Sequence, residues 1–579
     1  MRFALAGLVS LLSAGLTVLG SSDAQATGPW GTPIEAPGTA ALNADGSSIM
    51  LDLSCGAIGN CGAIGFYKDG ASDYQAFVEN EVAGTWGSAE EIPGFAALNV
   101  GGDVGDIMLI SCAGVGSCTA GGDYADASGT LQSFVVEESD GIWGNAEEVP
   151  GFSSANGAGP GTTLLSLSCS SPGNCGAGGS YVNASGQIQA YVISEAGGQW
   201  GSAFEVPGTA SLNGGGYAGL DALQCAANGD CSASGYYTTA QNLVGTFVVS
   251  EAGGNWLNAG GLSFTGIGAA TGDAAPSVLA CGSPGNCSLS GVFTTSATEF
   301  NSYFVNQVGG VWQSPKDPSP NYDTNFQVAY SSMSCTSSGN CAASGVISEG
   351  PDSRQALVDL ENNGVWGQGQ LLNGLVYGGP DQIPGLGAGS NNVGNSVGVS
   401  VSCVGDLACT AVGEYYDSAN QQQAFVVDES NGAWGTATEL TGSQTLNLGG
   451  GDAIVSVSCM VDDSCSIVGG YTDAAQNVQS FVDTSAAVFT APLAPTVMVA
   501  SKSAGDISVG VSVPTNDGGS VITGYQYSLN GQGWVNVPLA QASNFQIRHL
   551  KPHKKYRVEI RAVNLIGDGT PASSLVIVK

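Results

Sequence analysis

Histidine and positive charge are scarce in this 579-residue chain, and both shortages narrow its chemistry. The only histidines are His549 and His553, near the C-terminus. Lysine and arginine number 12 against 48 aspartates and glutamates, so the formal net charge is −36 at pH 7. Without histidine, a Ser-His-Asp or Cys-His mechanism is excluded from the long stretch before residue 549. The excess of acids argues against binding of nucleic acid or sulfated polymers by that stretch.

Long hydrophobic runs are also missing, except at the N-terminus. Arg2 precedes the apolar stretch 3–19, and residues 24–26 (Ala-Gln-Ala) have the small-x-small pattern of a cleavage site. Together these features are typical of a secretory signal peptide. No other stretch approaches the length of a membrane span. We therefore expect a signal peptide over 1–26 and a secreted, extracellular mature protein without a membrane span.

Unpaired cysteine is absent too, because all 16 cysteines fall into eight Cys-x5-Cys pairs. In an exported protein this pattern predicts disulfides, each worth about 2 kcal/mol in the chain-entropy model. Zinc is the weaker alternative, since its ligands favour shorter spacings and usually include histidine. The predicted disulfides join Cys55 to Cys61, Cys112 to Cys118, Cys169 to Cys175, Cys225 to Cys231, Cys281 to Cys287, Cys335 to Cys341, Cys403 to Cys409 and Cys459 to Cys465.

The cysteine pairs mark a repeat. In seven copies a Trp lies 31 residues after the first cysteine, as from Cys55 to Trp86, whereas the gap from each Trp to the next cysteine varies from 23 to 37 residues. Within one copy, alternating and β-rich segments predict four antiparallel strands, the first two stapled by the disulfide and the fourth opening at the Trp. A constant four-stranded unit joined by variable loops is typical of a propeller blade.

The ends of the repeat region complement each other. Residues 30–35 resemble a fourth strand without its first three, and residues 453–483 supply three strands that no Trp follows. One strand plus three would complete an eighth blade and remove the exposed sheet edges. We therefore predict an eight-bladed β-propeller over 27–487, with no helical periodicity, then a linker over 488–493. An open β-solenoid and a string of small domains are the alternatives.

Loops of such a ring are the natural place for binding. The disulfides and the turns before each Trp should lie on one face, and the variable loops and the links between second and third strands on the other. The latter face gathers Gly, Asn, Asp and Tyr, and two of its acids, Asp103 and Asp106, make calcium possible, although a polar turn is the simpler interpretation. No other cofactor is expected. The candidate binding residues are Tyr67, Asp103, Asp106, Tyr217, Tyr415 and Tyr416.

Paired carboxylates remain the one enzymatic possibility, since a glycoside hydrolase needs two acids around the scissile bond. A recurrent acid of the fourth strand (Glu91, Glu148, Glu205, Glu439) follows the repeat and is interpreted as structural, as is the recurrent Trp. A catalytic acid should break the repeat. Asp381, in an insertion near 374–395, is therefore the candidate catalytic residue.

Residues 494–579 differ in composition and resemble a fibronectin type III domain. The resemblance is carried by Ala494-Pro495, by 514–520 (Pro-Thr-Asn-Asp-Gly-Gly-Ser), by 522–525 (Ile-Thr-Gly-Tyr), by Leu550, by 556–564 (Tyr-Arg-Val-Glu-Ile-Arg-Ala-Val-Asn) and by Gly567. It implies a seven-stranded sandwich in which Tyr556 is the family's tyrosine near the start of the sixth strand. The family's second-strand Trp is replaced by Val511, and Trp534 is expected to fill the core instead. The repeats themselves resemble disulfide-bearing repeat proteins among secreted actinobacterial products.

The sequence thus predicts an all-β protein, an eight-bladed propeller followed by a fibronectin type III sandwich. We expect a secreted, non-enzymatic binding or scaffold protein that recognises an extracellular polysaccharide or protein through the loop face. The alternative is a polysaccharide-acting glycoside hydrolase with a fibronectin type III accessory domain, an analogy with modular enzymes.

Overall fold

A computed structural model describes most of residues 30–579. The segments outside the description are 1–29, 45, 153–160, 227–229, 268–272, 295–299, 318–326, 338, 349–353, 368–369, 372–395, 406–407, 417–420, 431–432, 461–463, 486–490, 504, 513, 515–521, 523, 538–543 and 565–566. The predicted signal peptide and Asp381 lie outside the described residues.

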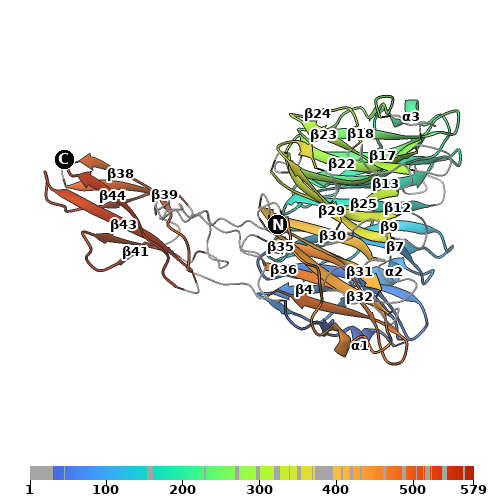
Figure 1. Ribbon diagram of the computed structural model, residues 1–579, viewed down its shortest axis with the longest axis horizontal. Helices are drawn as coiled ribbons and strands as arrows, with labels where there is room; N and C mark the ends of the chain where they lie inside the picture. Colours follow the sequence, from blue (N-terminus) through green and yellow to red (C-terminus); the bar gives the residue numbers. More distant parts are fainter. Residues whose placement is uncertain are drawn as a thin grey trace, which may run out of the picture.

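Eight antiparallel sheets follow one another along the chain as far as residue 484 (Figure 1). The first comprises β2 (Ser48–Ala57), β3 (Asn60–Lys68), β4 (Tyr74–Val82), β5 (Thr85–Trp86) and β6 (Glu90–Glu91). The second comprises β7 (Val104–Gly114), β8 (Ser117–Ala125), β9 (Leu131–Ser139), β10 (Ile142–Trp143) and β11 (Glu147–Glu148). The third comprises β12 (Thr162–Ser171), β13 (Asn174–Val182), β14 (Ile188–Ser194) and β15 (Phe204–Glu205). The fourth comprises β16 (Ala218–Cys225), β17 (Cys231–Thr238), β18 (Val244–Ala252), β19 (Asn255–Trp256) and β20 (Gly260–Gly261).

The second half repeats this arrangement. The fifth sheet comprises β21 (Ala274–Ser283), β22 (Asn286–Thr294), β23 (Phe300–Val308) and β24 (Val311–Trp312). The sixth comprises β25 (Gln327–Ser337), β26 (Asn340–Ser348), β27 (Arg354–Asn362), β28 (Val365–Trp366) and β29 (Gln370–Leu371). The seventh comprises β30 (Ser396–Gly405), β31 (Ala408–Tyr416), β32 (Gln422–Ser430), β33 (Ala433–Trp434) and β34 (Thr438–Glu439). The eighth comprises β35 (Asp452–Met460), β36 (Ser464–Thr472), β37 (Val478–Thr484) and, from the other end of the region, β1 (Ile34–Glu35).

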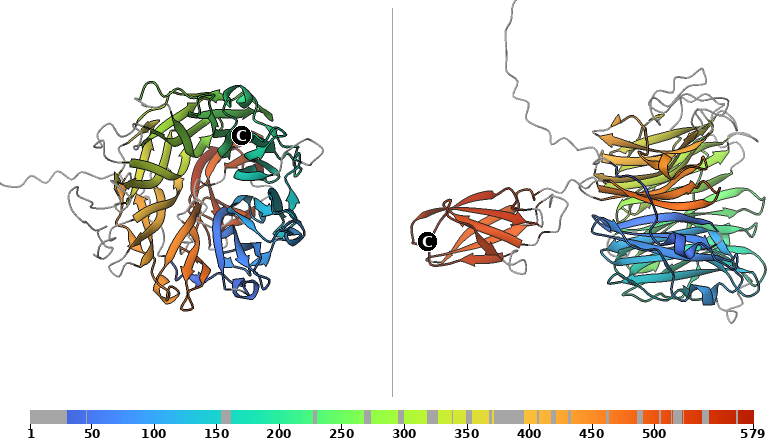
Figure 2. Two further views of the ribbon diagram at one scale, coloured as in Figure 1. Left: turned by 90° about the vertical axis from the view of Figure 1, so that its right-hand side faces the viewer. Right: turned by 90° about the horizontal axis from the view of Figure 1, so that it is seen from below.

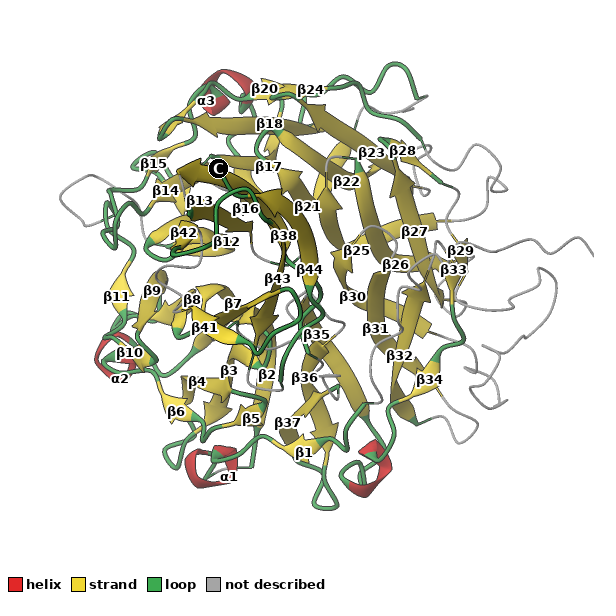
Figure 3. Ribbon diagram, turned by 90° about the vertical axis from the view of Figure 1, so that its left-hand side faces the viewer, coloured by secondary structure: helices red, strands yellow, loops and turns green. Residues whose placement is uncertain are grey.

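The eighth sheet is built from both ends of the repeat region, as predicted. β1 pairs antiparallel with β37, Ile34 opposite Val482, and Trp30 makes a further bridge to Ser485. β35 in turn contacts β2 of the first sheet. Figures 2 and 3 show the eight sheets arranged around a ring in sequence order, with the first strands innermost and the last sheet beside the first.

The disulfides and the turns before each Trp share one edge of the sheets. All eight predicted disulfides are present, and each joins cysteines directly opposite in the first hairpin, with Cα atoms 3.9–4.0 Å apart. The amide of Gly84, in the turn before Trp86, donates to the carbonyl of Gly59 in the stapled hairpin (2.9 Å). Gly59 has φ +61°, and a Cβ there would lie 2.7 Å from the Gly84 nitrogen, so both conformation and space require glycine.

Side chains of one innermost strand accept backbone hydrogen bonds from the next. The hydroxyl of Ser54 accepts from the amide of Cys112, and counting this one such a bond is present at seven of the eight interfaces, six with a serine hydroxyl and one with the Gln224 side-chain oxygen as acceptor, with lengths of 2.8–3.0 Å. One of the seven joins Ser458 to Cys55, from the last sheet to the first. At the remaining interface the position is occupied by Ala280, whose side chain has no acceptor.

A second set of inter-sheet bonds uses an acid near the end of the third strand. Glu81 accepts from the hydroxyls of Ser466 and Thr484 in the eighth sheet, both at 2.8 Å. The equivalent Glu251 accepts from Ser194 (3.0 Å). This acid stands five residues before the Trp in six sheets, a regularity that is visible in the sequence but was not used in the predictions. It makes the sheet interfaces polar near this edge and apolar further in.

The apolar core lies between sheets rather than within them. Val78 of the first sheet packs in one cluster with Phe134 and Trp143 of the second. Phe77, on the other side of the same strand, packs with Val482 of the eighth. The recurrent Trp therefore contributes to packing between neighbours, as predicted, and at Trp143 it is 5% exposed.

Two details differ from the predictions. The fourth strand is interrupted in most sheets: β5 and β6 both pair with β4, but Ala89 between them donates instead to the carbonyl of Pro37 in the preceding sheet (2.6 Å). Short helical turns also occur between sheets, α1 (Thr39–Leu42), α2 (Phe95–Leu98), α3 (Thr209–Leu212) and the 3₁₀ turn η3 (Ser443–Thr445). They are single turns, too short to produce a helical periodicity.

The C-terminal region forms two sheets that pack as a sandwich of seven strands (Figure 1). One contains β38 (Thr496–Ser503), β39 (Asp506–Ser512) and β42 (Asn544–Ile547). The other contains β41 (Val535–Val537), β40 (Gly524–Leu529), β43 (Lys555–Val563) and β44 (Ala572–Ile577). The hydroxyl of Tyr556 accepts from the amide of Lys551 (3.0 Å), which is the role expected of this tyrosine. Trp534 does not fill the core as predicted, because it lies partly exposed beneath the guanidinium of Arg561 (4.1 Å).

Candidate functional site

The predicted loop-face tyrosines divide into two kinds. Tyr67 and Tyr415 are 3% and 4% exposed, and their hydroxyls donate to Glu91 (2.7 Å) and Glu439 (3.0 Å) of their own sheets. The same pair recurs as Tyr181 with Glu205 (3.3 Å). These tyrosines are therefore structural, and their prediction as ligand contacts is corrected. The prediction that the recurrent fourth-strand acid is structural is confirmed.

Two asparagines in the loops of the same face are also structural. Asn99 and Asn213, which follow α2 and α3, are 3% and 5% exposed. The side-chain amide of Asn99 donates to the carbonyl of Tyr74 in the preceding sheet (2.6 Å), and that of Asn213 to the carbonyl of Ile188 (3.1 Å). Each asparagine thus connects the loop between two consecutive sheets to the first of those two sheets.

The remaining candidates are more accessible but belong to three different sheets. Asp103 is exposed, and its carboxylate accepts from the amide of Val104 (3.0 Å). Tyr217 is 48% exposed and stacks on Tyr236, with ring centroids 5.4 Å apart. Tyr416 is half-buried at the end of β31. Asp106 lies in β7, with its side chain outside the description, and within the described part of the chain no group of three metal-ligating side chains occurs.

A cavity of about 710 Å³ lies elsewhere, between the fifth and sixth sheets at the edge that carries the disulfides. The fifth sheet contributes β23 and the stretch after Trp312, and the sixth contributes the turn between β27 and β28. Lysine, amide and aromatic side chains all line it. The side chains used in the argument below are Phe304, Asn306, Gln313, Lys316, Asp317 and Trp366.

The cavity forms where the fifth sheet departs from the repeat. Eight residues before the Trp, the other six Trp-containing sheets have Val, but here the residue is Phe304. Four residues after the Trp, none of the other six has a basic residue, but here it is Lys316. Pro315 replaces the alanine whose amide bonds to the preceding sheet in four others, and proline has no N–H to donate.

The aromatic wall of the cavity is a stacked pair. The rings of Phe304 and Trp366 lie 3.8 Å apart between centroids and 8° from parallel. Phe304 is 2% exposed, so Trp366, which is partly exposed, presents the pair toward the cavity. Gln313 and Lys316 are exposed and also line the cavity, and the backbone of Lys316 pairs with that of Phe304. An aromatic surface beside amide and charged groups is the composition of a small-molecule or sugar site.

Two buried carboxyls stand behind this wall. Glu361 is 2% exposed and accepts from Ser288 (2.7 Å) and Asn306. Burial raises its pKa, and these hydrogen bonds and the charge of Lys316 partly oppose the rise. Burial raises the pKa of Asp359 to about 7. Since both side chains are enclosed and hydrogen-bonded within the protein, they are not placed to attack or protonate a ligand.

Sequence reasoning missed this site although its signal was present. The criterion that a functional residue should break the repeat was applied to acids, which led to Asp381. Applied to every residue type, it identifies Phe304 and Lys316.

Comparison with known proteins identifies the C-terminal domain. The family model of the fibronectin type III domain matches residues 492–578, and this segment is therefore a fibronectin type III domain. Similar solved structures include the fn3 domain of human collagen alpha-1(XX) chain, 22% identical, which covers 15% of this chain and 87% of its own length with a TM-score of 0.14. A titin kinase with its flanking domains is 25% identical over 15% of this chain and 17% of its own, with a TM-score of 0.14. No curated protein matches the chain.

Eight disulfides and a fibronectin type III domain fit an extracellular protein. Among the residues that the structure describes, no helix is long and apolar enough to cross a membrane.

Proposed function

We propose that this is a secreted, non-enzymatic binding or scaffold protein whose eight sheets are the blades of a propeller closed by one strand plus three. The paired ends, the contact of β35 with β2 and the recurrent bonds between innermost strands support the propeller. The signal-like N-terminus and the disulfides support secretion. The ligand is an extracellular polysaccharide or protein, and the cavity between the fifth and sixth blades is where it binds.

The observation that carries this proposal is the concentration of repeat-breaking residues around one cavity. A rigid ring tolerates substitutions that preserve its packing, so a Phe, a Lys and a Pro introduced together in one blade indicate a local role. The partly exposed Trp366 offers a flat apolar face on which a sugar ring can stack, and Gln313 and Lys316 supply donors for its hydroxyls.

The test uses the mature protein and a panel of insoluble neutral polysaccharides, with depletion from solution as the measurement. The double variant Gln313→Ala with Lys316→Ala should weaken binding about tenfold, a loss of about 1.4 kcal/mol. Both positions are exposed, so folding should be unaffected. Lys68→Ala, an exchange of a lysine in the first blade, is the control and should bind as the wild type does.

The same incubation addresses the hydrolase alternative. Among the described residues that line the cavity, Asp317 is the one carboxylate. Hydrolysis of a glycosidic bond requires two acids. Release of soluble reducing ends would favour the hydrolase, and their loss on Asp381→Asn would identify its acid. Depletion without release supports a binding protein. Equal depletion of wild type and the cavity variant would refute the cavity as the site.

A further inference from the structure

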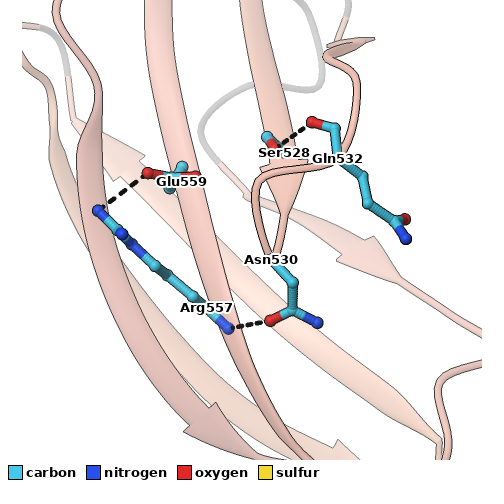
Figure 4. Close-up of polar contacts among 5 residues, drawn as sticks. All are labelled: Ser528, Asn530, Gln532, Arg557 and Glu559. Carbon is cyan, nitrogen blue, oxygen red and sulfur yellow. Dashed lines mark hydrogen bonds and ion pairs between the residues drawn. The ribbon is translucent and has the colours of Figure 1, made fainter.

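Positive charge is concentrated at one end of the fibronectin type III domain. Arg557 and Arg561, in the middle of β43, are paired with Glu559 (3.0 Å) and Asp568 (2.6 Å). Figure 4 shows Arg557 lying along the strand toward Glu559, with its backbone amide bonded to Asn530. The other bases of the domain whose side chains the structure describes lie at the end of the sandwich where β43 begins. We call this group the basic tip; it consists of Arg548, Lys551, Lys554, Lys555 and Lys579.

The basic tip is exposed and held in place by its backbone. All five side chains are exposed, and within the described part of the chain none forms an ion pair. The amide of His553 donates to Val578 (2.8 Å), and that of Val578 donates to Lys554 (3.0 Å), so the C-terminal strand fixes the turn. The Tyr556 hydroxyl holds Lys551 from the other side. Among the described residues, Asp506 is the one acid at this end of the domain.

The tip faces away from the chain's connection to the ring. Pro492, where the domain begins, bonds to Thr570 at the opposite end of the sandwich (2.9 Å). The nine residues of β43 separate the two ends by about 30 Å. Charges in physiological salt are screened within about 8 Å, so the acids beyond Pro492 do not neutralise the tip through the domain.

We propose that the basic tip binds a linear anionic polysaccharide. Its charges lie on an exposed turn, which suits a chain that contacts several lysines in succession. Charge complementarity favours a polyanion, since the tip gathers five bases in a protein of net charge −36. This surface is separate from the cavity between the fifth and sixth blades.

The experiment measures binding of the mature full-length protein to fluorescently labelled polygalacturonate and dextran sulfate by anisotropy at 50 mM salt. Lys554→Gln with Lys555→Gln should weaken binding at least tenfold, and raising salt to about 200 mM should weaken wild-type binding by about tenfold or more. The matched control, Lys68→Gln with Arg354→Gln, removes the same two charges from the ring and should change affinity less than twofold. Replacement of both tip lysines by Arg should preserve binding.

Four further arms decide between outcomes. Uncharged dextran should not respond to the tip variant, and the cavity variant Gln313→Ala with Lys316→Ala should retain the anionic polymers, so this inference and the proposed function can fail separately. The inference is overturned if neither polymer binds at 50 mM salt, or if the tip and ring variants lose affinity equally. Preferential binding to phosphatidylglycerol vesicles or duplex DNA would also overturn it.

Discussion

Glu79 provides a direct test of how this ring tolerates buried acids. It lies in β4, is 1% exposed, and neither carboxylate oxygen has a hydrogen-bond partner among the described residues. The equivalent position, seven residues before the Trp, is Val or Ile in five other sheets and Asp359 in the sixth. Burial raises the pKa of Glu79 to about 9 from its ordinary value of 4.5. The side chain is therefore neutral in the folded protein at pH 7 and charged in the unfolded one.

The sign of the pH dependence follows from that shift. Because the pKa of Glu79 is raised in the folded protein, the folded state binds the proton more tightly than the unfolded state does. The resulting contribution to the free energy of unfolding is fully present at pH values below the pKa in the unfolded chain. It is lost as pH rises toward the folded value of about 9. Each pH unit within this window costs about 1.4 kcal/mol, so the wild type should lose on the order of 4 kcal/mol between pH 5 and pH 8 through this residue.

Glu79→Gln removes the titration while preserving shape. We expect its melting temperature to fall less than that of the wild type between pH 5 and pH 8, by about 4 °C for a cooperative unit of this size. Glu79→Val, which restores the repeat residue, should show the same loss of pH dependence. Glu90→Gln, at an exposed position of β6, is the control. Parallel melting curves for wild type and Glu79→Gln across this pH range would refute the reasoning.

Two other predictions concern what holds the ring together. Ser458→Ala removes the acceptor for the Cys55 amide between the eighth and first sheets, and Ser402→Ala removes the equivalent acceptor for Cys459 between the seventh and eighth. Each variant should lower the free energy of unfolding by about 1 kcal/mol in urea titrations. A much larger effect at Ser458 would show that the interface between the last and first sheets is the weak one. Reduction of the eight disulfides should lower the melting temperature without releasing zinc, as followed by a metal-sensitive dye, and release of zinc would contradict the disulfides.

The strand order was predictable because the same pattern of strands and turns occurs in successive copies of the repeat. Cysteine spacing agrees in all eight copies and the hairpin glycine in six of them, so a misreading in one copy is corrected by the others. The pairing of β1 with β37 followed from counting strands at the two ends, although the strands are far apart in sequence. The interrupted fourth strand was not predictable, because the Ala89 amide is diverted to Pro37 by a contact between sheets.

The candidate site was less predictable, since composition does not report exposure. Tyr67 and Asn99 belong to a polar loop face, yet both are buried because hydrogen bonds to Glu91 and Tyr74 satisfy their polar atoms. Their recurrence was the available signal: a residue that returns in most copies serves the repeat. The same reasoning correctly assigned Glu91 to structure and would have removed Tyr67 from the binding candidates.

Several exceptions to the repeat lie in the fifth sheet, and their positions show what the sheets around the cavity lose and keep. Ala280 of that sheet interrupts the series of acceptors along the innermost strands, and Pro315 removes the amide that elsewhere bonds to the preceding sheet on the outside. Both losses are local, because the bonds at the other interfaces, including Ser458 to Cys55, remain. The stacked Phe304 and Trp366 pack the fifth sheet against the sixth, where Ala280 offers no acceptor, while leaving Trp366 partly exposed. The fifth sheet thus lacks one bond toward the sixth sheet, where the cavity lies, and one toward the fourth, while the innermost-strand bonds at the other seven interfaces keep the sheets together.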